Sequence, residues 1–178
     1  MKTKINDFEF VGNKQLTEYV IPDGVTEIGC DAFLGCTNLK SITIPNSVTK
    51  IGLFAFCRCT GLQSITIPNS VTEIGEGAFC RCTSLTNVTI PDSVKEIGWG
   101  IFDSYKGVQS VTIPNSVTLI SDYTFAGCKN LQSVTIPDSV TKIGKAAFAG
   151  CTNLQSVTIP RGCQYEDAFS DKTKVIVR

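Results

Sequence analysis

Residues 136–160 read IPDSVTKIGKAAFAGCTNLQSVTIP, and this pattern recurs with few changes through most of the 178-residue chain. Every proline lies at the same place in the pattern, 23 residues from the next one, a regularity that independent loops would not produce. The prolines are Pro22, Pro45, Pro68, Pro91, Pro114, Pro137 and Pro160. A fixed period of this length predicts a solenoid, in which one structural unit is repeated and stacked.

Apolar residues recur at the same period and predict the core of the stack. The columns of valine, isoleucine, phenylalanine and leucine begin at Val25, Ile28, Phe33 and Leu39. A single unit cannot bury its apolar edge, but units stacked at the inter-strand spacing of about 4.8 Å join these columns into continuous ridges. We therefore expect one hydrophobic core that runs the length of the stack.

The local pattern assigns each part of a unit. Between Ser41 and Ile44 apolar residues alternate with hydroxyls, which predicts a short half-buried strand that the following proline ends. The Val-x-x-Ile-Gly segment predicts a second short extended stretch, with positive φ at its glycine, as at Gly29. Between Ala32 and Leu39 the apolar spacing of three predicts one turn of α or 3₁₀ helix.

The chain is predicted to form one domain, residues 1–178, because its length and its 42% apolar content suit a single core. Within this domain we expect a degenerate N-terminal cap repeat at 1–24, regular 23-residue repeats at 25–160 and a shortened C-terminal cap at 161–178. Caps are needed because the end units would otherwise expose the apolar columns.

Charge and hydropathy exclude several classes of partner. Sixteen Lys and Arg balance sixteen Asp and Glu, so no basic surface favours nucleic acid. No stretch approaches the roughly 20 apolar residues that span a bilayer. The N-terminus has lysines but no apolar segment of the kind that follows them in a signal peptide, so the sequence predicts no export signal.

The sequence offers no catalytic site, and we expect neither an enzyme nor a cofactor or metal. Histidine is absent, which removes the commonest general base and His-assisted nucleophiles. Glu73 and Glu96 should be neighbours in one column and could form an acid/base pair, but a solvated row of charges is the favoured explanation.

Seven of the nine cysteines fall into two groups. One column is predicted to be buried thiols, since cysteine is small and often buried. It contains Cys36, Cys59, Cys82, Cys128 and Cys151, with Tyr105 in place of the fourth copy. The neighbours Cys57 and Cys80 could bind zinc with Cys59 and Cys82, form a disulfide, or remain free thiols. Free thiols are the favoured reading.

Three aromatic residues lie off the core register and are candidate partner contacts: Phe54, Trp99 and Tyr123. Their columns otherwise hold polar residues or glycine, and tryptophan and tyrosine are enriched at binding hot spots. The fourth repeat is also the least regular, with Ile101 for alanine and Tyr105 for cysteine. Partial burial by neighbouring side chains is the alternative explanation.

The hydroxyl-bearing face of the long strands is a second candidate surface, represented by Thr66, Thr89, Thr112 and Thr135. Repeat solenoids commonly bind partners through a sheet face. A solvated face of β-favouring residues is the alternative. Ice or glycan binding is a further possibility, although curvature of the stack would spoil a match to a lattice.

The repeat pattern quoted above strongly resembles the BspA-like class of leucine-rich repeats, found mostly in bacteria and in some parasitic protists. The resemblance covers essentially the whole chain and implies a leucine-rich-repeat solenoid, a right-handed β/α superhelix with one parallel strand per repeat. It further implies a surface or secreted protein that adheres to or binds other proteins. Surface members normally carry an export signal, so the localisation of this chain stays open.

Three functions follow from these observations. The first is a protein-interaction or adhesion module, and the second is a structural spacer within a larger surface adhesin. The third, a polysaccharide-active parallel β-helix enzyme, requires clustered carboxylates that the strand columns lack. We expect a monomer, although the strand edge at 175–177 would allow end-to-end association if it is not capped.

Overall fold

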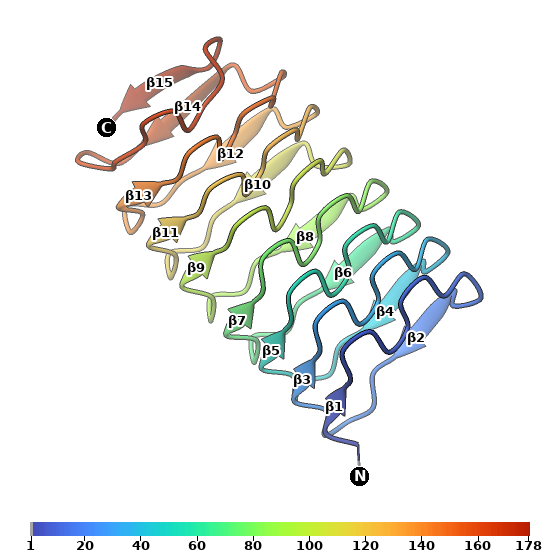
Figure 1. Cartoon of the computed structure of the whole chain (residues 1–178). Coiled ribbons are helices and arrows are strands. Elements are labelled where there is room, and N and C mark those ends of the chain that lie inside the picture. Colours follow the sequence, from blue (N-terminus) through green and yellow to red (C-terminus); the bar gives the residue numbers. More distant parts are fainter. Residues whose placement is uncertain (1) are drawn as a thin grey trace.

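The computed structural model describes residues 2–178 as one stack of coils, with the termini at opposite ends (Figure 1). Each coil carries a long and a short strand on different sides. The long strands are β2 (Glu18–Val20), β4 (Ser41–Thr43), β6 (Ser64–Thr66), β8 (Asn87–Thr89), β10 (Ser110–Thr112), β12 (Ser133–Thr135), β14 (Ser156–Ile159) and β15 (Lys174–Val177). The short strands are β1 (Lys4–Ile5), β3 (Glu27–Ile28), β5 (Lys50–Ile51), β7 (Glu73–Ile74), β9 (Glu96–Ile97), β11 (Leu119–Ile120) and β13 (Lys142–Ile143).

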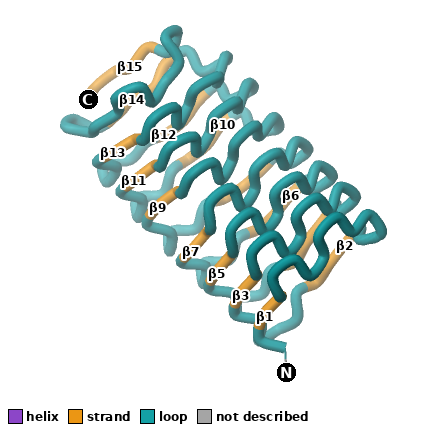
Figure 2. The backbone as a smooth tube through the Cα atoms, viewed as in Figure 1, coloured by secondary structure: helices purple, strands orange, loops and turns teal. Residues whose placement is uncertain are grey.

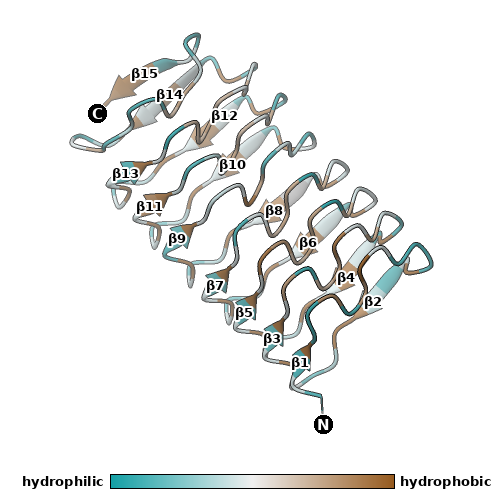
Figure 3. Ribbon diagram, viewed as in Figure 1, coloured by the Kyte–Doolittle hydropathy of each residue, from teal (hydrophilic) through white to brown (hydrophobic). Residues whose placement is uncertain are grey.

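All strand pairs are parallel, and the regular ones join residues 23 positions apart. Glu27 is level with Lys50 in the pair β3–β5, and Ser110 is level with Ser133 in the pair β10–β12. The short strands combine an outward charged residue with an inward isoleucine in most coils, as the change from teal to brown along them shows (Figure 3). The predicted solenoid of stacked parallel strands is therefore confirmed.

The predicted helical turn is wrong, because the described residues contain no helix (Figure 2). Consecutive turns occupy this segment, with left-handed backbone at Asp31 (φ 54°) and Gly35 (φ 70°). An α-helix does not tolerate such residues in its interior. The amide of Phe33 donates to Ala55 O of the next coil at 2.8 Å, whereas other amides of the segment bond locally, such as Cys36 N to Phe33 O at 3.1 Å.

The glycines that follow the short strands recur for a reason other than the expected positive φ. Gly52 and Gly75 have no positive φ. A Cβ on Gly52 would lie 2.6 Å from the carbonyl carbon of Gly29, and one on Gly75 would lie 2.5 Å from the amide nitrogen of Leu53. The prediction of positive φ is therefore wrong, and these glycines instead let adjacent coils approach each other.

The core is one continuous set of apolar columns, as the periodicity predicts. The phenylalanine rings stack on one another along the whole stack, with Phe33 and Phe56 parallel at a centroid distance of 5.2 Å. The ladder runs through Phe10, Phe33, Phe56, Phe79, Phe102, Phe125, Phe148 and Phe169. The coils that we expect to act as caps, 1–24 and 161–178, supply its two end rings.

The cysteine column is buried, and its thiols bond to the backbone of the preceding coil. Cys59 Sγ donates to Phe33 O at 3.1 Å, and Cys82 Sγ donates to Phe56 O at the same distance. Burial raises the pKa of the Cys82 thiol to about 12. These cysteines therefore have a structural role.

Cys57 and Cys80 form a disulfide, so the expectation of free thiols is wrong for this pair. They lie beside the buried cysteine column, on adjacent coils, with their Cα atoms 4.7 Å apart. Cys59 and Cys82 point into the core, so the four cysteines do not converge. The described residues contain no group of three or more potential metal ligands.

Candidate interaction surface

The pairing of the short strands is interrupted between β7 and β9, and at the same level the long strands β8 and β10 are not paired with each other. The short strands form two separate sheets, β1-β3-β5-β7 and β9-β11-β13, and the wider space between them is visible in Figure 1. Elsewhere the amides of Thr72 and Gly75 donate to the preceding coil at 2.9 and 2.8 Å. Among the described backbone groups, the equivalent amides of Lys95 and Gly98 make no such bond. We call this interruption the open joint.

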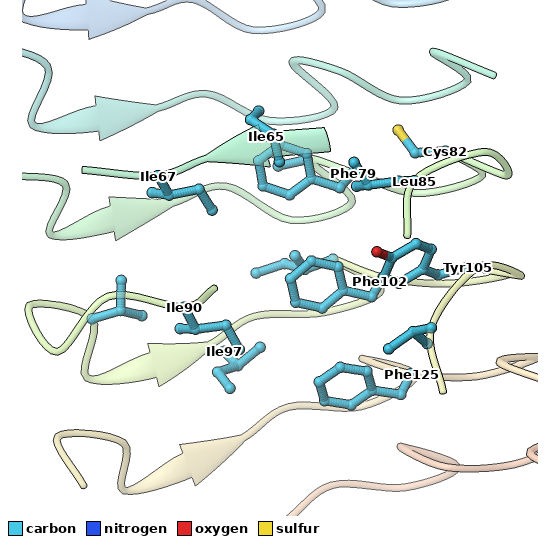
Figure 4. Close-up of a cluster of buried hydrophobic side chains, with 14 of the residues drawn as sticks. Ile65, Ile67, Phe79, Cys82, Leu85, Ile90, Ile97, Phe102, Tyr105 and Phe125 are labelled. Atoms are coloured by element: carbon cyan, nitrogen blue, oxygen red, sulfur yellow. The ribbon is translucent and has the colours of Figure 1, made fainter. Parts of the chain in front are cut away.

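Two large residues in the core account for the open joint. Ile101 occupies the alanine column and Tyr105 the cysteine column, and both are almost completely buried. The rings of Phe79 and Phe102, on the two sides of the joint, are 5.9 Å apart, the widest spacing in the phenylalanine ladder. Figure 4 shows Tyr105 beside Phe102, on the same coil. The added volume therefore keeps the two coils apart.

A shallow groove of about 830 Å³ lies over the open joint. Leu53 and Trp99 supply exposed apolar surface along one side. The rest of the lining combines small and polar residues with five charged residues, Lys50, Glu73, Glu76, Lys95 and Glu96. The groove thus combines one aromatic and one aliphatic side chain with lysine and glutamate side chains.

Trp99 and Tyr123 form an exposed aromatic pair at the groove. Their ring centroids are 6.0 Å apart at an interplanar angle of 60°. Trp99 is 44% exposed and Tyr123 is 41% exposed, which is high for such large apolar side chains. Tyr123 lies beside the groove rather than in its lining. The structure therefore brings together two of the three aromatic residues that the sequence singles out.

Phe54, the third aromatic candidate, is not part of this pair. Its ring covers Gly77 of the next coil, where any Cβ would collide with it. Phe54 is consequently half-buried. Leu53 is an exposed apolar residue that the sequence pattern did not single out, although it lies in the same 23-residue column as Trp99, a register that indicates exposure.

The four threonine candidates lie in one outward-facing row on the long strands. Thr66, Thr89, Thr112 and Thr135 are all exposed. Three of them, Thr89, Thr112 and Thr135, also line a second groove of about 530 Å³ beside the proline column. This row is on a different side of the coil from the open joint. The two sets of candidates therefore form separate surfaces.

Arg178 closes one end of the second groove. Its guanidinium donates to Asp138 at 2.7 Å and to Ile136 O at 2.8 Å. The sequence alone gave no signal for this contact, because the two residues are 40 positions apart and lie outside the repeat register.

Ion pairs on the short-strand side are exposed. Lys50 pairs with Glu73 at 3.2 Å, and this hydrogen bond raises the pKa of Lys50. Glu96 instead accepts a hydrogen bond from Ser121 Oγ at 2.9 Å. Glu73 and Glu96 thus have different partners, and such solvated contacts contribute little to stability. Residues 2–178 include no helix able to cross a membrane.

Comparison with solved structures defines the class of protein. The stack superposes on a leucine-rich-repeat protein of T. pallidum with a TM-score of 0.80 and 36% identity, covering 85% of this chain and 71% of that one. A Bacteroides ovatus leucine-rich-repeat protein gives 0.70 and 29%, over 98% and 55% of the two chains. One from Eubacterium ventriosum gives 0.75 and 30%, over 82% and 40%. This chain is thus a leucine-rich-repeat solenoid that spans only part of these relatives.

The repeat pattern then gives the family. The description "BspA type Leucine rich repeat region (6 copies)" matches residues 3–130 and 102–176, and the chain belongs to this family. No curated protein matches the chain by sequence. Proteins built from these repeats are generally interaction or surface modules and are generally not enzymes. The predicted resemblance is confirmed.

Proposed function

We propose that this chain is a non-enzymatic protein-interaction or adhesion module, with a protein as its partner and a contact centre at Trp99 and Tyr123. The exposed aromatic pair beside the open joint is the observation that carries this proposal. Large aromatic side chains on a protein surface are disproportionately binding hot spots, and they contribute most beside a concave surface that a partner can fill. Leu53 would extend the apolar contact.

Phe54 and the threonine row would contribute less to binding. Phe54 packs against Gly77, so only part of its ring remains available. Thr66, Thr89, Thr112 and Thr135 offer a neutral, regular surface that fits a second, weaker contact area. A partner large enough to reach both sides of the coil would bury both surfaces.

The disulfide supports a location on the cell surface or outside the cell. Disulfides form and persist in oxidising compartments and are rare in the reducing cytosol. Cys57 and Cys80 are bonded to each other while the buried column thiols remain reduced. This pattern fits an exported protein whose core is closed to oxidants.

A structural spacer in a larger surface protein is the second candidate. The regular, neutral outward face of β10, β12 and β14 favours it, since that face carries hydroxyls and no exposed aromatic residue. A polysaccharide-active enzyme is a weaker candidate, because the outward positions of the long strands from β4 to β14 carry no carboxylate and Glu73 is paired with Lys50.

A pull-down from candidate host and bacterial extracts tests the proposal. The wild-type chain is compared with a Trp99→Ala/Tyr123→Ala variant and with Tyr165→Ala, which removes an exposed aromatic residue far from the joint. We expect a partner that wild type and Tyr165→Ala retain and the double variant loses, with all three showing the same thermal stability. If the double variant also retains the partner, the contact does not depend on Trp99 and Tyr123 and lies elsewhere on the chain. No retained protein in any extract would favour the spacer.

A further inference from the structure

The loops that lead into the long strands from β2 to β14 carry an excess of positive charge. They stack along one side of the molecule (Figure 1). Six of the sixteen cations lie in these loops but only one of the sixteen acids, so the rest of the chain has ten cations and fifteen acids. The even overall charge, which predicts no basic surface, therefore hides a basic side of the stack. The loops are residues 11–17, 34–40, 57–63, 80–86, 103–109, 126–132 and 149–155.

Four of the six cations occupy four successive coils, and we call them the basic row. All four are exposed, and each is next in the chain to a member of the buried cysteine and Tyr105 column, which points into the core. None of the ion pairs within residues 2–178 involves them. The row thus presents positive charge that the described part of the chain does not neutralise. Its members are Arg58, Arg81, Lys106 and Lys129.

Contacts between coils fix the backbone beneath the basic row. The disulfide joins Cys57 to Cys80, which directly precede the two arginines, and holds their Cα atoms 4.7 Å apart. Asn130 Nδ2 donates to Lys106 O at 2.8 Å, which ties together the loops of the two lysines. A ligand of the row would therefore not have to order the backbone, and this favours binding.

The two arginines stand where other coils have glycine. The backbone is left-handed at both positions, with φ 61° at Arg58 and 57° at Arg81. Glycine adopts this conformation freely, whereas a residue with a side chain does so at a cost in free energy. No ion pair within residues 2–178 offsets this cost, which favours a role for the guanidinium groups outside the chain. The glycines of the same column are Gly12, Gly35, Gly127 and Gly150.

We propose that the basic row binds an acidic segment of a protein partner. The inference rests on the proposed function and names the chemistry of one part of that partner. A guanidinium group matches a carboxylate with two parallel hydrogen bonds, and the lysines add two further positive charges. A segment that lies along the stack would place its carboxylates over successive coils, and complementary charge of this kind also speeds association.

Nucleic acids and acidic polysaccharides fit the basic row less well. Bases and sugar rings are commonly held by aromatic side chains on which they stack. None of the exposed aromatic residues among residues 2–178 lies in the loops of the row. The row therefore offers charge and hydrogen bonds but no stacking surface. The exposed aromatic residues are Phe8, Trp99, Tyr123 and Tyr165.

Fluorescence anisotropy of a labelled hexaglutamate peptide tests the proposal, at about 0.1 M salt, where charges more than roughly 10 Å apart are largely screened. The row variant is Arg58→Gln/Arg81→Gln/Lys106→Gln/Lys129→Gln. The control variant removes four exposed cations outside the row and is Lys142→Gln/Lys145→Gln/Arg161→Gln/Lys174→Gln. We expect the row variant to bind at least ten-fold more weakly than wild type, and the control to stay within about three-fold.

Two further variants separate binding from folding. Asp103→Asn removes the one acid of the loops and should strengthen peptide binding about two-fold. Arg58→Gly/Arg81→Gly should weaken binding while its thermal midpoint stays at or above that of wild type, because glycine relieves the left-handed backbone. A lower midpoint would show that the arginines serve the fold instead and would contradict the proposal. Far-ultraviolet circular dichroism checks that every variant is folded.

The outcomes of the peptide assay are decisive. The proposal is overturned if wild type does not bind hexaglutamate at millimolar concentration, or if the row and control variants weaken binding equally. It is also overturned if hexathymidylate or a galacturonate hexasaccharide binds more tightly than the peptide. A pull-down that retains no protein contradicts the proposed function, whereas a partner retained through Trp99 and Tyr123 together with no peptide binding contradicts this inference alone.

Discussion

At the scale of single residues, Tyr105 is the clearest local defect in the stack. Its hydroxyl is buried and has no hydrogen-bond partner in the described structure, whereas the cysteines of the same column donate to a carbonyl of the preceding coil. Burial also raises the pKa of Tyr105. A buried polar group without a partner costs about 1–3 kcal/mol.

Tyr105→Phe should therefore increase the free energy of unfolding by about 1 kcal/mol, because it removes the unpaired hydroxyl and keeps the ring. Urea unfolding followed by circular dichroism measures the change. Tyr123→Phe, which removes an exposed hydroxyl, is the control and should lie within about 0.5 kcal/mol of wild type. A loss of stability in Tyr105→Phe would mean that the hydroxyl has a partner.

The glycine column gives a second residue-scale prediction. Gly52→Ala should destabilise by about 1–3 kcal/mol or more, because its Cβ would meet the backbone of Gly29 and force two coils apart. Gly98→Ala is the matched control, since the nearest atom to its Cβ is 3.6 Å away, in Ile101. Ser121 already carries a side chain in this column. Equal unfolding midpoints for the two variants would contradict the account of close approach.

At the scale of elements, the disulfide fastens the coil of β5 to the coil of β7. It closes a segment of 23 residues, and a link of that length stabilises by roughly 3 kcal/mol through the entropy of the unfolded chain. Reductant should lower the urea midpoint of wild type by a corresponding amount. Without reductant, the Cys57→Ser/Cys80→Ser variant should have the same urea midpoint as reduced wild type, and reductant should not change it. A wild-type midpoint that reductant does not move would rule out this contribution.

The buried cysteine column predicts a loss of stability at alkaline pH. Burial raises the pKa of Cys82 from about 9 to about 12, and burial also raises the pKa of Cys59. Above about pH 9 the unfolded chain loses thiol protons that the folded chain keeps, so unfolding becomes more favourable by about 1.4 kcal/mol per pH unit for each such thiol. The stabilisation is complete below about pH 9 and is lost as the pH approaches 12.

Unfolding midpoints measured across the alkaline range test this slope. Cys82→Ala should be less stable at neutral pH but should show a shallower decline, because one titrating thiol is gone. An unchanged slope in that variant would assign the alkaline loss to other groups.

The elements that the sequence predicts well are those whose pattern has one structural solution. Alternation of apolar and hydroxyl residues between Ser41 and Ile44 is specific to a half-buried strand. An apolar spacing of three, as between Phe33 and Cys36, is not specific to a helix. Two successive turns with left-handed residues also place both side chains on the inner side of the coil. The disulfide forms because Cys57 faces Cys80 of the next coil whereas Cys59 faces the core. The 23-residue period alone does not predict this difference in side-chain direction.

The contact candidates were predictable in part. The register identified Trp99 and Tyr123 as exposed, and both are. It could not predict the groove beside them, because the open joint results from the summed volumes of Ile101 and Tyr105 against neighbours in another coil. Packing differences of this kind depend on the three-dimensional stack rather than on one column.

At the scale of the whole molecule, the open joint divides the stack into two blocks that still share one core. Stability in a solenoid is approximately a sum of terms for the units and for the interfaces between neighbours, so the weakest interface sets where the stack opens first. The phenylalanine and turn contacts cross the joint, whereas neither the short strands β7 and β9 nor the long strands β8 and β10 pair across it. Local opening should therefore begin on the strand sides of the joint, which include the short-strand side next to Trp99.

Native-state hydrogen exchange should show this directly. The amides of Lys95 and Gly98 should exchange faster than those of Thr118 and Ser121, which donate to the preceding coil at 3.0 and 2.8 Å. An Ile101→Ala/Tyr105→Cys variant restores the regular residues and should close the joint, slowing exchange at Lys95 and Gly98.

Tryptophan fluorescence gives an independent reading of the same closure, because Trp99 is the only tryptophan of the chain and lines the groove. Its emission should change in the closed variant and stay constant in a variant that alters the core far away, such as Val157→Ala. If closure also removes the retained partner while Trp99 and Tyr123 are intact, the opening itself is part of the binding surface. Fast exchange that persists in the closed variant would show that Ile101 and Tyr105 do not cause the opening.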